Sequence, residues 1–121
     1  MRHVKQISST GSLARYQRQY RHQKDQLRRI GYICMGSLAE RRLSCGKATC
    51  ACHRDISKQH GPYHQWTRKV GGKTQSRMLP ESLVRLYREG IRNHRKLDRV
   101  IKQMQEISLL VFEAVKIQEK A

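Results

Sequence analysis

The chain has 121 residues, with 26 lysines and arginines against nine aspartates and glutamates, so its formal net charge is +17 and an anionic partner is expected. Apolar residues make up only 37% of the chain, with one tryptophan and one phenylalanine, and so small a core is expected to need support from a metal ion or a second chain. No apolar run approaches the roughly 18 residues that cross a bilayer, and residues 1–10 lack the apolar stretch of a secretory signal, which excludes an integral membrane protein and predicts a cytoplasmic one.

The N-terminal segment, residues 1–35, is predicted to contain a basic helix over residues 12–30. Its apolar side chains follow spacings of three and four residues, with Gln23 at the missing step between Tyr20 and Leu27, and Gly11 and Gly31 bracket the run. The apolar positions are Leu13, Tyr16, Tyr20, Leu27 and Ile30. Arginines dominate the other faces, so this helix carries part of the positive charge.

The middle segment, residues 36–80, is predicted to form three short strands and a metal-binding loop. We expect strands at residues 37–43, 63–70 and 73–79, because Gly71-Gly72 separates the last two and both glycines can adopt the positive φ of a tight hairpin. Residues 45–61 lack a regular pattern and need a cross-link. The predicted fold class is therefore α+β: a small zinc-stabilised three-stranded antiparallel sheet flanked by an N-terminal helix and a long C-terminal helix.

The C-terminal segment, residues 81–121, is predicted to be one long helix that starts after Pro80. Apolar or compatible residues recur along it with alternating spacings of four and three, as in a coiled coil. These positions, which we call the apolar seam, are 83, 87, 90, 94, 97, 101, 104, 108, 111 and 115. A helix of this length with a continuous seam predicts that its far half packs either on a second chain, as a homodimer through the C-terminal helix, or on the N-terminal helix.

Three cysteines and a histidine in the middle segment have the spacing of a metal site. The pattern is C-x4-C-x-C-x7-H, formed by Cys45, Cys50, Cys52 and His60. Zn²⁺ prefers four tetrahedral thiolate and imidazole ligands, so we expect a structural zinc ion with a complete ligand shell. His53 is the alternative fourth ligand, although its place directly after Cys52 makes joint binding awkward. Cys34, ten residues outside the group, is expected to be a core residue.

Basic residues gather in two places that could contact phosphates. One set repeats at helical spacing along the first half of the C-terminal helix and comprises Arg85, Arg88, Arg92, Arg95 and Arg99. The other surrounds the metal loop and the hairpin, interleaved with Tyr63, His64 and Trp66, and comprises Arg41, Arg42, Lys47, Arg54, Lys58, Arg68, Lys69, Lys73 and Arg77. Trp66, the only tryptophan, is expected to pack in the core.

The acidic residues do not suggest an active site. The nine carboxylates are scattered, six of them on the C-terminal helix, whereas hydrolysis of nucleic acid with Mg²⁺ needs carboxylates grouped around the ion. Neither a nucleophile motif nor a phosphate-binding glycine loop is present in the sequence. We therefore expect a protein that is not an enzyme.

Several short motifs resemble a family of small, largely uncharacterised prokaryotic proteins of the zinc-ribbon type. The motifs are Cys45-Gly46-Lys47, Cys50-Ala51-Cys52, His60-Gly61-Pro62-Tyr63, Gly72-Lys73-Thr74 and Arg77-Met78-Leu79-Pro80. The resemblance covers about residues 36–100 and leaves out the N-terminal helix. It implies that the three cysteines and His60 are the family's metal ligands, and that members lie near transposase or integrase genes.

Charge, metal motif and resemblance together favour a zinc-containing protein that binds DNA or RNA without catalysis, as an accessory or regulatory factor of a mobile genetic element. A transposase or recombinase would then be a partner. The alternative is a protein-interaction subunit whose positive charge docks onto an acidic enzyme or a ribonucleoprotein.

Overall fold

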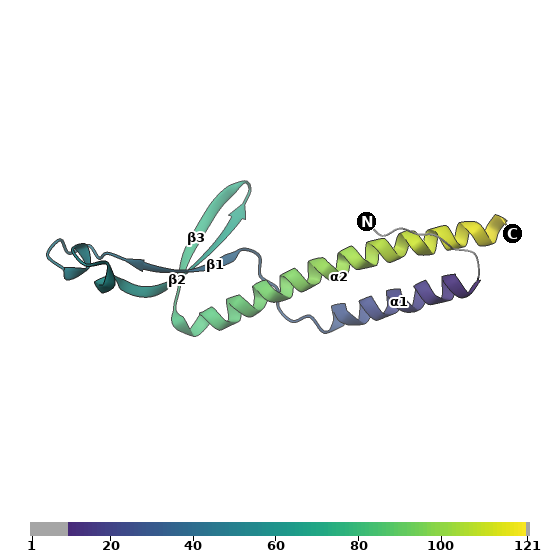
Figure 1. Ribbon diagram of the computed structural model, residues 1–121, viewed down its shortest axis with the longest axis horizontal. Helices are drawn as coiled ribbons and strands as arrows, with labels where there is room; N and C mark the ends of the chain where they lie inside the picture. Colours follow the sequence, from purple (N-terminus) through teal and green to yellow (C-terminus); the bar gives the residue numbers. More distant parts are fainter. Residues whose placement is uncertain (1–9, 121) are drawn as a thin grey trace. The chain divides into compact units, whose positions relative to one another are not determined.

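The computed structural model describes residues 10–120 and has the predicted α+β fold (Figure 1). Its elements are α1 (Thr10–Arg28), β1 (Ser37–Leu43), β2 (His60–Val70), β3 (Lys73–Leu79) and α2 (Glu81–Lys120), with two short 3₁₀ segments, Ala51–His53 and Ile56–Lys58, between β1 and β2. The chain forms two compact units. Among the described residues, one unit contains residues 10–31 and 95–120. The other unit spans Tyr32–His94.

The sheet of the Tyr32–His94 unit is antiparallel, with β2 between β1 and β3. β2 and β3 are joined through Gly71 and Gly72, whose φ angles of 57° and 80° are the left-handed values that favour glycine, so the predicted hairpin is confirmed. β2 begins at His60, three residues before the predicted start, because His60 pairs with Leu43 of β1. Between Arg41 and Leu43 the register shifts, as in a β-bulge.

One face of the sheet packs on the first part of α2 to form the core of this unit. Trp66 and Leu79 from the sheet meet Val84 and Ile91 from the helix, and Cys34, Leu38 and Tyr87 pack around them. Trp66 Nε1 donates a hydrogen bond of 2.9 Å to the carbonyl oxygen of Met35, which satisfies the indole N–H in the core. Trp66 is therefore a packing residue, as its scarcity suggested.

Gly90 lets the segment before β1 approach α2 closely. The backbone N–H of Cys34 donates a hydrogen bond of 3.0 Å to the carbonyl oxygen of Gly90. A Cβ at position 90 would lie 2.8 Å from the Cβ of Cys34, a distance that a real pair of carbon atoms avoids. The seam position 90 thus needs a glycine because a larger residue would not fit against Cys34.

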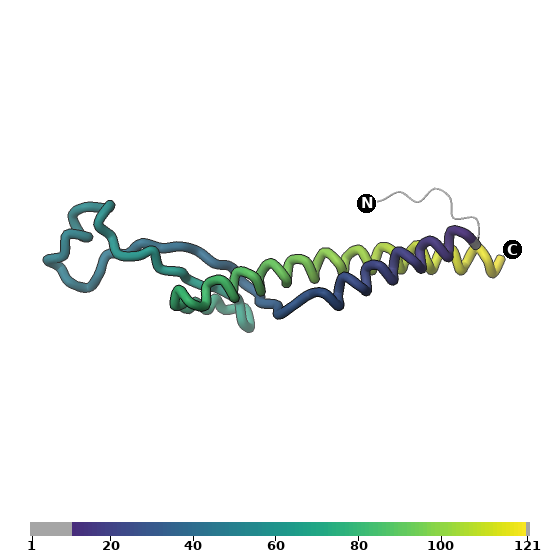
Figure 2. The backbone as a smooth tube through the Cα atoms, turned by 90° about the horizontal axis from the view of Figure 1, so that it is seen from below, coloured from purple at the N-terminus to yellow at the C-terminus, as the bar shows by residue number. Residues whose placement is uncertain are grey.

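The other unit pairs α1 with the second half of α2, and Figures 1 and 2 both show these segments side by side. Within the described residues its buried side chains are Tyr16, Ile107 and Ala114. Partly buried apolar residues surround them: Leu13, Tyr20, Leu110, Val111 and Ile117. Two helices alone enclose little, so this core is thin.

Most of the buried positions of α2 lie next to the predicted apolar seam, although Gly90 of the seam is buried and Tyr87 and Val111 are partly buried. The buried apolar side chains of α2 are Val84, Ile91, Val100, Ile107 and Ala114. Three seam positions, Leu83, Ile101 and Val115, are instead 37%, 41% and 38% exposed. Apolar residues flank both sides of the buried positions, so periodicity alone could not centre the face. Among the described residues, no helix is long and apolar enough to cross a membrane.

Candidate metal centre

The end of the sheet brings the predicted ligands together. β1 ends at Leu43 and β2 begins at its register partner His60, so Cys45 and His60 emerge at the same end of the sheet. The loop between them folds back through the 3₁₀ segment Ala51–His53, which carries Cys52 and directly follows Cys50. Four residues far apart along the loop thus meet because the two strands hold its ends.

The distances between the four ligand atoms suit one metal ion. The Sγ atoms of Cys45, Cys50 and Cys52 and a ring nitrogen of His60 all lie within 4.8 Å of one another. The Sγ atoms of Cys45 and Cys52 are 3.6 Å apart, and Sγ of Cys50 lies 3.4 Å from Nε2 of His60. A tetrahedral zinc ion with Zn–S bonds of ~2.3 Å would place two sulfurs roughly 3.8 Å apart. The cluster could therefore hold a metal ion, and its donor set is compatible with zinc.

His53, the alternative fourth ligand, lies outside the cluster of ligand atoms. Its Nε2 atom lies 2.7 Å from the carbonyl oxygen of Cys45, a hydrogen bond that ties the 3₁₀ segment to the start of the loop. The hydroxyl of Ser44 donates a hydrogen bond of 3.3 Å to the carbonyl oxygen of Cys52 and makes a second tie. The geometry thus selects His60 as the fourth member of the cluster and gives His53 a supporting position.

The loop favours the thiolate that a metal requires. A hydrogen bond from the backbone of Cys52, followed by one from His60, lowers the pKa of Cys50 from 9.0 to about 6. The backbone N–H of Cys45 lowers the pKa of the Cys52 thiol, but desolvation and the neighbouring thiols outweigh it and leave that pKa raised. Three thiols crowded together cannot all ionise easily without a cation, whereas a bound divalent ion would favour all three thiolates.

Cys34 stands apart from the cluster. It is partly buried against the Trp66 core, and its Sγ donates to the carbonyl oxygen of Met35 at 3.4 Å. The predicted core position of Cys34 is therefore confirmed.

The basic residues around the loop and hairpin are all exposed, and all but Arg42 fall into three groups. Lys47, Arg54 and Lys58 lie on the metal loop. By strand alternation, Arg41 and Lys69 share the face of the sheet turned away from α2, which we call the open face, whereas Arg68, Lys73 and Arg77 lie on the face of Trp66. Arg42 lies at the register shift and donates a hydrogen bond of 3.4 Å to the carbonyl oxygen of Gly61.

The three aromatic residues of this region lie on different faces of the sheet. Tyr63 is on the open face and 41% exposed. His64 lies on the opposite face, 3.0 Å from the carboxylate of Glu81, and Trp66 is buried. The three aromatic residues therefore do not share one surface, because successive strand residues point to opposite faces. Cations still lie beside two of them: Arg41 is the register partner of Tyr63, and Cζ of Arg68 lies 5.0 Å from the centroid of the Trp66 ring.

The open face is polar and was not singled out from the sequence. It comprises Ser37, Ala39, Arg41, Tyr63, Gln65, Thr67, Lys69, Thr74, Ser76 and Met78. Arg41 donates a hydrogen bond of 3.3 Å to Oε1 of Gln65, and the hydroxyls of Thr67 and Ser76 are 3.1 Å apart. No acidic residue belongs to this described face, since Glu40 alternates to the other side. The strand register, which sequence pattern alone could not fix, is the signal that reveals it.

The arginines of α2 are exposed at every predicted position. Arg85, Arg88 and Arg92 belong to the Tyr32–His94 unit, and Arg95 and Arg99 belong to the helical unit.

The fold and the cluster define a small α+β protein with a Cys₃His site that could hold zinc. Within that class the chain belongs to the family described as Domain of unknown function (DUF6788), which matches residues 4–89. The match includes α1, which the motifs of the sequence analysis left out. No curated protein and no solved structure matches the chain.

Proposed function

We propose that this protein is a zinc-containing nucleic-acid-binding protein without catalytic activity. Its zinc ion would be structural, because four protein ligands fill a tetrahedral shell and leave no position for a substrate or water. Zinc would hold the loop of residues 44–59 on the end of the sheet, and with it the cations Lys47, Arg54 and Lys58.

The open face of the sheet is the observation that carries the proposal. It is uncovered by any described element of its unit, it lacks carboxylates, and it presents hydroxyl and amide groups together with Arg41 and Lys69. Hydroxyls, amides and guanidinium groups are the side chains that bind phosphates and base edges. A carboxylate on the same surface would repel the polymer, so its absence from the described strands of this face supports an anionic ligand.

Charge supports the same ligand. The chain carries a net charge of +17, and Tyr32–His94 holds twelve arginines and lysines against four carboxylates. Two of those carboxylates are already engaged: Glu81 lies against His64, and Asp55 accepts hydrogen bonds from Ser57. Neither of these two carboxylates pairs with an arginine or lysine, so they leave the cations of this unit able to neutralise phosphates and release counterions.

The biological setting belongs to the proposal as well. The motifs Cys45-Gly46-Lys47, Cys50-Ala51-Cys52 and His60-Gly61-Pro62-Tyr63 resemble proteins expected near transposase or integrase genes, and this resemblance supports an accessory or regulatory role in a mobile genetic element. A transposase or recombinase would be the protein partner.

Fluorescence anisotropy with labelled duplex DNA and duplex RNA, measured over a range of salt concentrations, tests this function. We expect the logarithm of affinity to fall linearly with the logarithm of salt concentration, with a slope of several, because each phosphate contact contributes about −0.9 to the slope for duplex DNA. The variant Arg41→Glu/Lys69→Glu should bind at least about tenfold more weakly.

The matched control is Lys116→Glu/Lys120→Glu, which makes the same change in net charge near the end of α2. We expect it to retain most of the affinity. Equal losses in both variants, or binding that ignores salt, would contradict an interface on the open face. If no nucleic acid binds and an acidic polypeptide co-purifies instead, the protein is an interaction subunit.

A further inference from the structure

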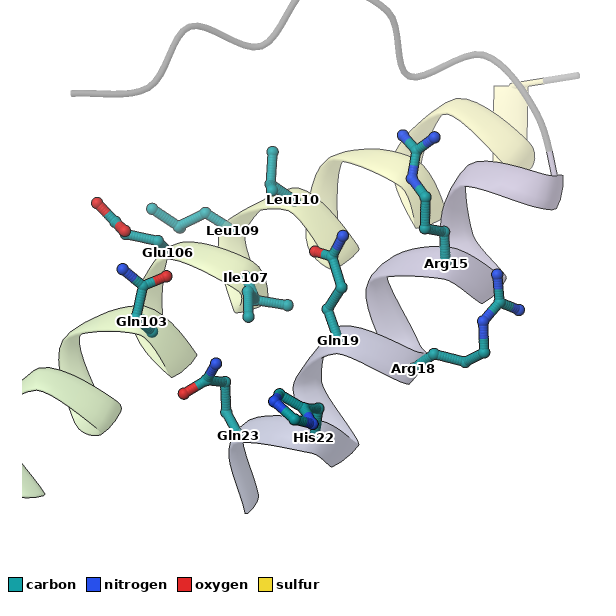
Figure 3. A pocket seen from close by; sticks show the side chains of 10 residues that line it. All are labelled: Arg15, Arg18, Gln19, His22, Gln23, Gln103, Glu106, Ile107, Leu109 and Leu110. Atoms are coloured by element: carbon teal, nitrogen blue, oxygen red, sulfur yellow. The ribbon is translucent and has the colours of Figure 1, made fainter. Parts of the chain in front are cut away.

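A groove runs along one side of the contact between α1 and the second half of α2 (Figure 3). It has a volume of about 580 Å³, and Ile107, Leu109 and Leu110 line its apolar part. Leu109 is 64% exposed and so presents apolar surface to the groove. The groove is therefore an apolar surface that the two helices alone leave open.

The two walls of the groove carry opposite charges. Arg15 and Arg18 of α1 line one wall, and Glu106 of α2 lines the other (Figure 3). Glu113 lies seven residues after Glu106, two helical turns along the same face of α2. Within residues 10–120, neither carboxylate has a basic side chain within ion-pair distance. The groove thus presents a cationic side and an acidic side, both exposed.

Beyond the residues that line the groove, the order of the charges along the helix pair reverses. The two helices are antiparallel, with the start of α1 beside the end of α2 (Figures 1 and 2). From that end, α1 presents Arg18 and then Asp25, one heptad later on the same face. α2 presents Glu106 and then Lys102, one turn earlier in sequence. Along the pair, α1 therefore presents a positive and then a negative side chain, whereas α2 presents a negative and then a positive one.

We propose that a second copy of this chain occupies the groove, with α1 of each copy packed against α2 of the other. A two-fold axis parallel to the helix pair brings the cationic wall of one copy onto the acidic wall of its partner, twice in each dimer. The result is a four-helix bundle in which Leu109 and Leu110 become core residues. The helix pair thus completes its core with its own copy.

A second copy fits the groove better than other occupants do. Nucleic acid would meet the carboxylates of Glu106 and Glu113, which repel phosphates. A purely acidic protein would meet the same repulsion, and a purely apolar ligand would leave the charged walls unmatched. The chain's own surface matches both walls at once. The part of α2 after Lys102 is also nearly balanced in charge, with Glu106, Glu113 and Glu119 against Lys116 and Lys120, so two strongly cationic chains can approach there.

Charge reversal of each wall in the full chain tests the dimer, with sedimentation velocity as the measurement. We expect the wild type to sediment as a dimer. Glu106→Lys/Glu113→Lys and Arg15→Glu/Arg18→Glu should each raise the dimer dissociation constant by roughly tenfold or more, because like charges then face each other. Mixing the two variants should restore a dimer, since each wall of one variant again meets the opposite charge on the other.

The matched control, Glu89→Lys/Glu119→Lys, changes the net charge equally at positions outside the groove and should remain dimeric. Leu109→Asp should be monomeric and keep its helix content, because its side chain is exposed in the single chain. A wild type that stays monomeric at about 100 μM would overturn the proposal, because dimers of this kind associate in the micromolar range or tighter. So would mixed variants that remain monomers, or groove variants that dimerise as well as the control.

Discussion

The Tyr32–His94 unit and the helical unit face the same shortage of apolar residues and differ in how they compensate for it. The first buries Trp66, Leu79, Val84 and Ile91 between a sheet and a helix, and adds a Cys₃His cluster where the sheet ends. The second buries Tyr16, Ile107 and Ala114 and leaves an apolar groove with charged walls. In a chain with 37% apolar residues, one region has a cluster that could hold a cross-linking metal ion, and the other has a surface on which we propose that a second copy packs.

Because the two units differ in this way, different substitutions should destabilise each of them. If a metal ion links the cluster, loss of a ligand removes a cross-link that no side-chain packing replaces, because within the loop of residues 44–59 the described buried side chain is Cys52 itself. Loss of a side chain from the helix pair removes part of a core that a second chain can complete. Substitutions should therefore act on one unit at a time.

The largest effect is expected from Cys50→Ser in the metal cluster. Binding of zinc and folding are coupled in such sites, with apparent binding energies of about 10 kcal/mol or more. We expect amide hydrogens of residues 44–60 to exchange as fast as in an unfolded peptide, while those of α1 remain protected, as measured by hydrogen exchange with mass spectrometry.

Cys34→Ser is the control for this experiment, because Cys34 lies in the core outside the cluster. It should leave the exchange of residues 44–60 unchanged. Equal protection of the loop in the two variants would mean that no metal cross-links it.

Trp66→Ala should have the next largest effect and separate the two cores. Removal of a buried indole costs about 3–5 kcal/mol, through the cavity and the lost hydrogen bond to Met35. Tyr16→Ala, the counterpart in the helical unit, should cost less, roughly 2–3 kcal/mol, because it removes a smaller ring from a thinner core. Urea unfolding measures the total loss in the free energy of unfolding, and hydrogen exchange shows which of the two units has lost protection. If either variant increased hydrogen exchange equally in both units, the two units would unfold together rather than independently.

Gly90→Ala should destabilise the protein, although the same change in an exposed helix gains about 1 kcal/mol. The new Cβ would lie 2.8 Å from the Cβ of Cys34 and force the segment before β1 away from α2. We expect a net loss of about 1–2 kcal/mol in chemical denaturation. Gly46→Ala, where an added Cβ meets nothing within 4 Å, is the control and should be close to neutral. A gain in stability for Gly90→Ala would refute the close approach.

Asp55→Asn should have the smallest effect and should depend on pH. The hydroxyl of Ser57 and then its backbone N–H donate hydrogen bonds to the Asp55 carboxylate and lower its pKa. A carboxylate with a lowered pKa in the folded state stabilises that state above its unfolded pKa, and this contribution is lost as the pH falls through the folded pKa.

The measurement is thermal unfolding of wild type and Asp55→Asn from neutral to about pH 3. The difference between the two proteins should shrink as the pH falls. A difference that stays constant, or grows in acid, would show that the capping hydrogen bonds of the Ile56–Lys58 segment do not act through the charge of Asp55.

Much of the fold could be predicted because its signals are local. Gly71-Gly72 fixes the hairpin through backbone conformation, Pro80 marks the start of α2, and the spacing of three cysteines and a histidine identifies the cluster before any contact is known. Each of these signals lies within a short stretch of chain.

What escaped prediction depends on contacts between distant residues. The early start of β2 depends on the pairing of His60 with Leu43, and the role of Gly90 depends on the approach of Cys34. The buried face of α2 is centred next to the predicted seam because what packs on the helix decides which apolar side chains are covered. The open face of the sheet follows from strand register, which couples residues that are far apart in sequence.

The metal content of the purified full chain is the most direct test of the account. Elemental analysis of wild-type protein, expressed with zinc and dialysed against a weak chelator, should find one zinc ion per chain, and none in Cys50→Ser or His60→Ala. Wild-type protein that is folded but free of metal, or variants that keep a full zinc ion, would contradict the claim that Cys45, Cys50, Cys52 and His60 hold the ion on which this fold depends.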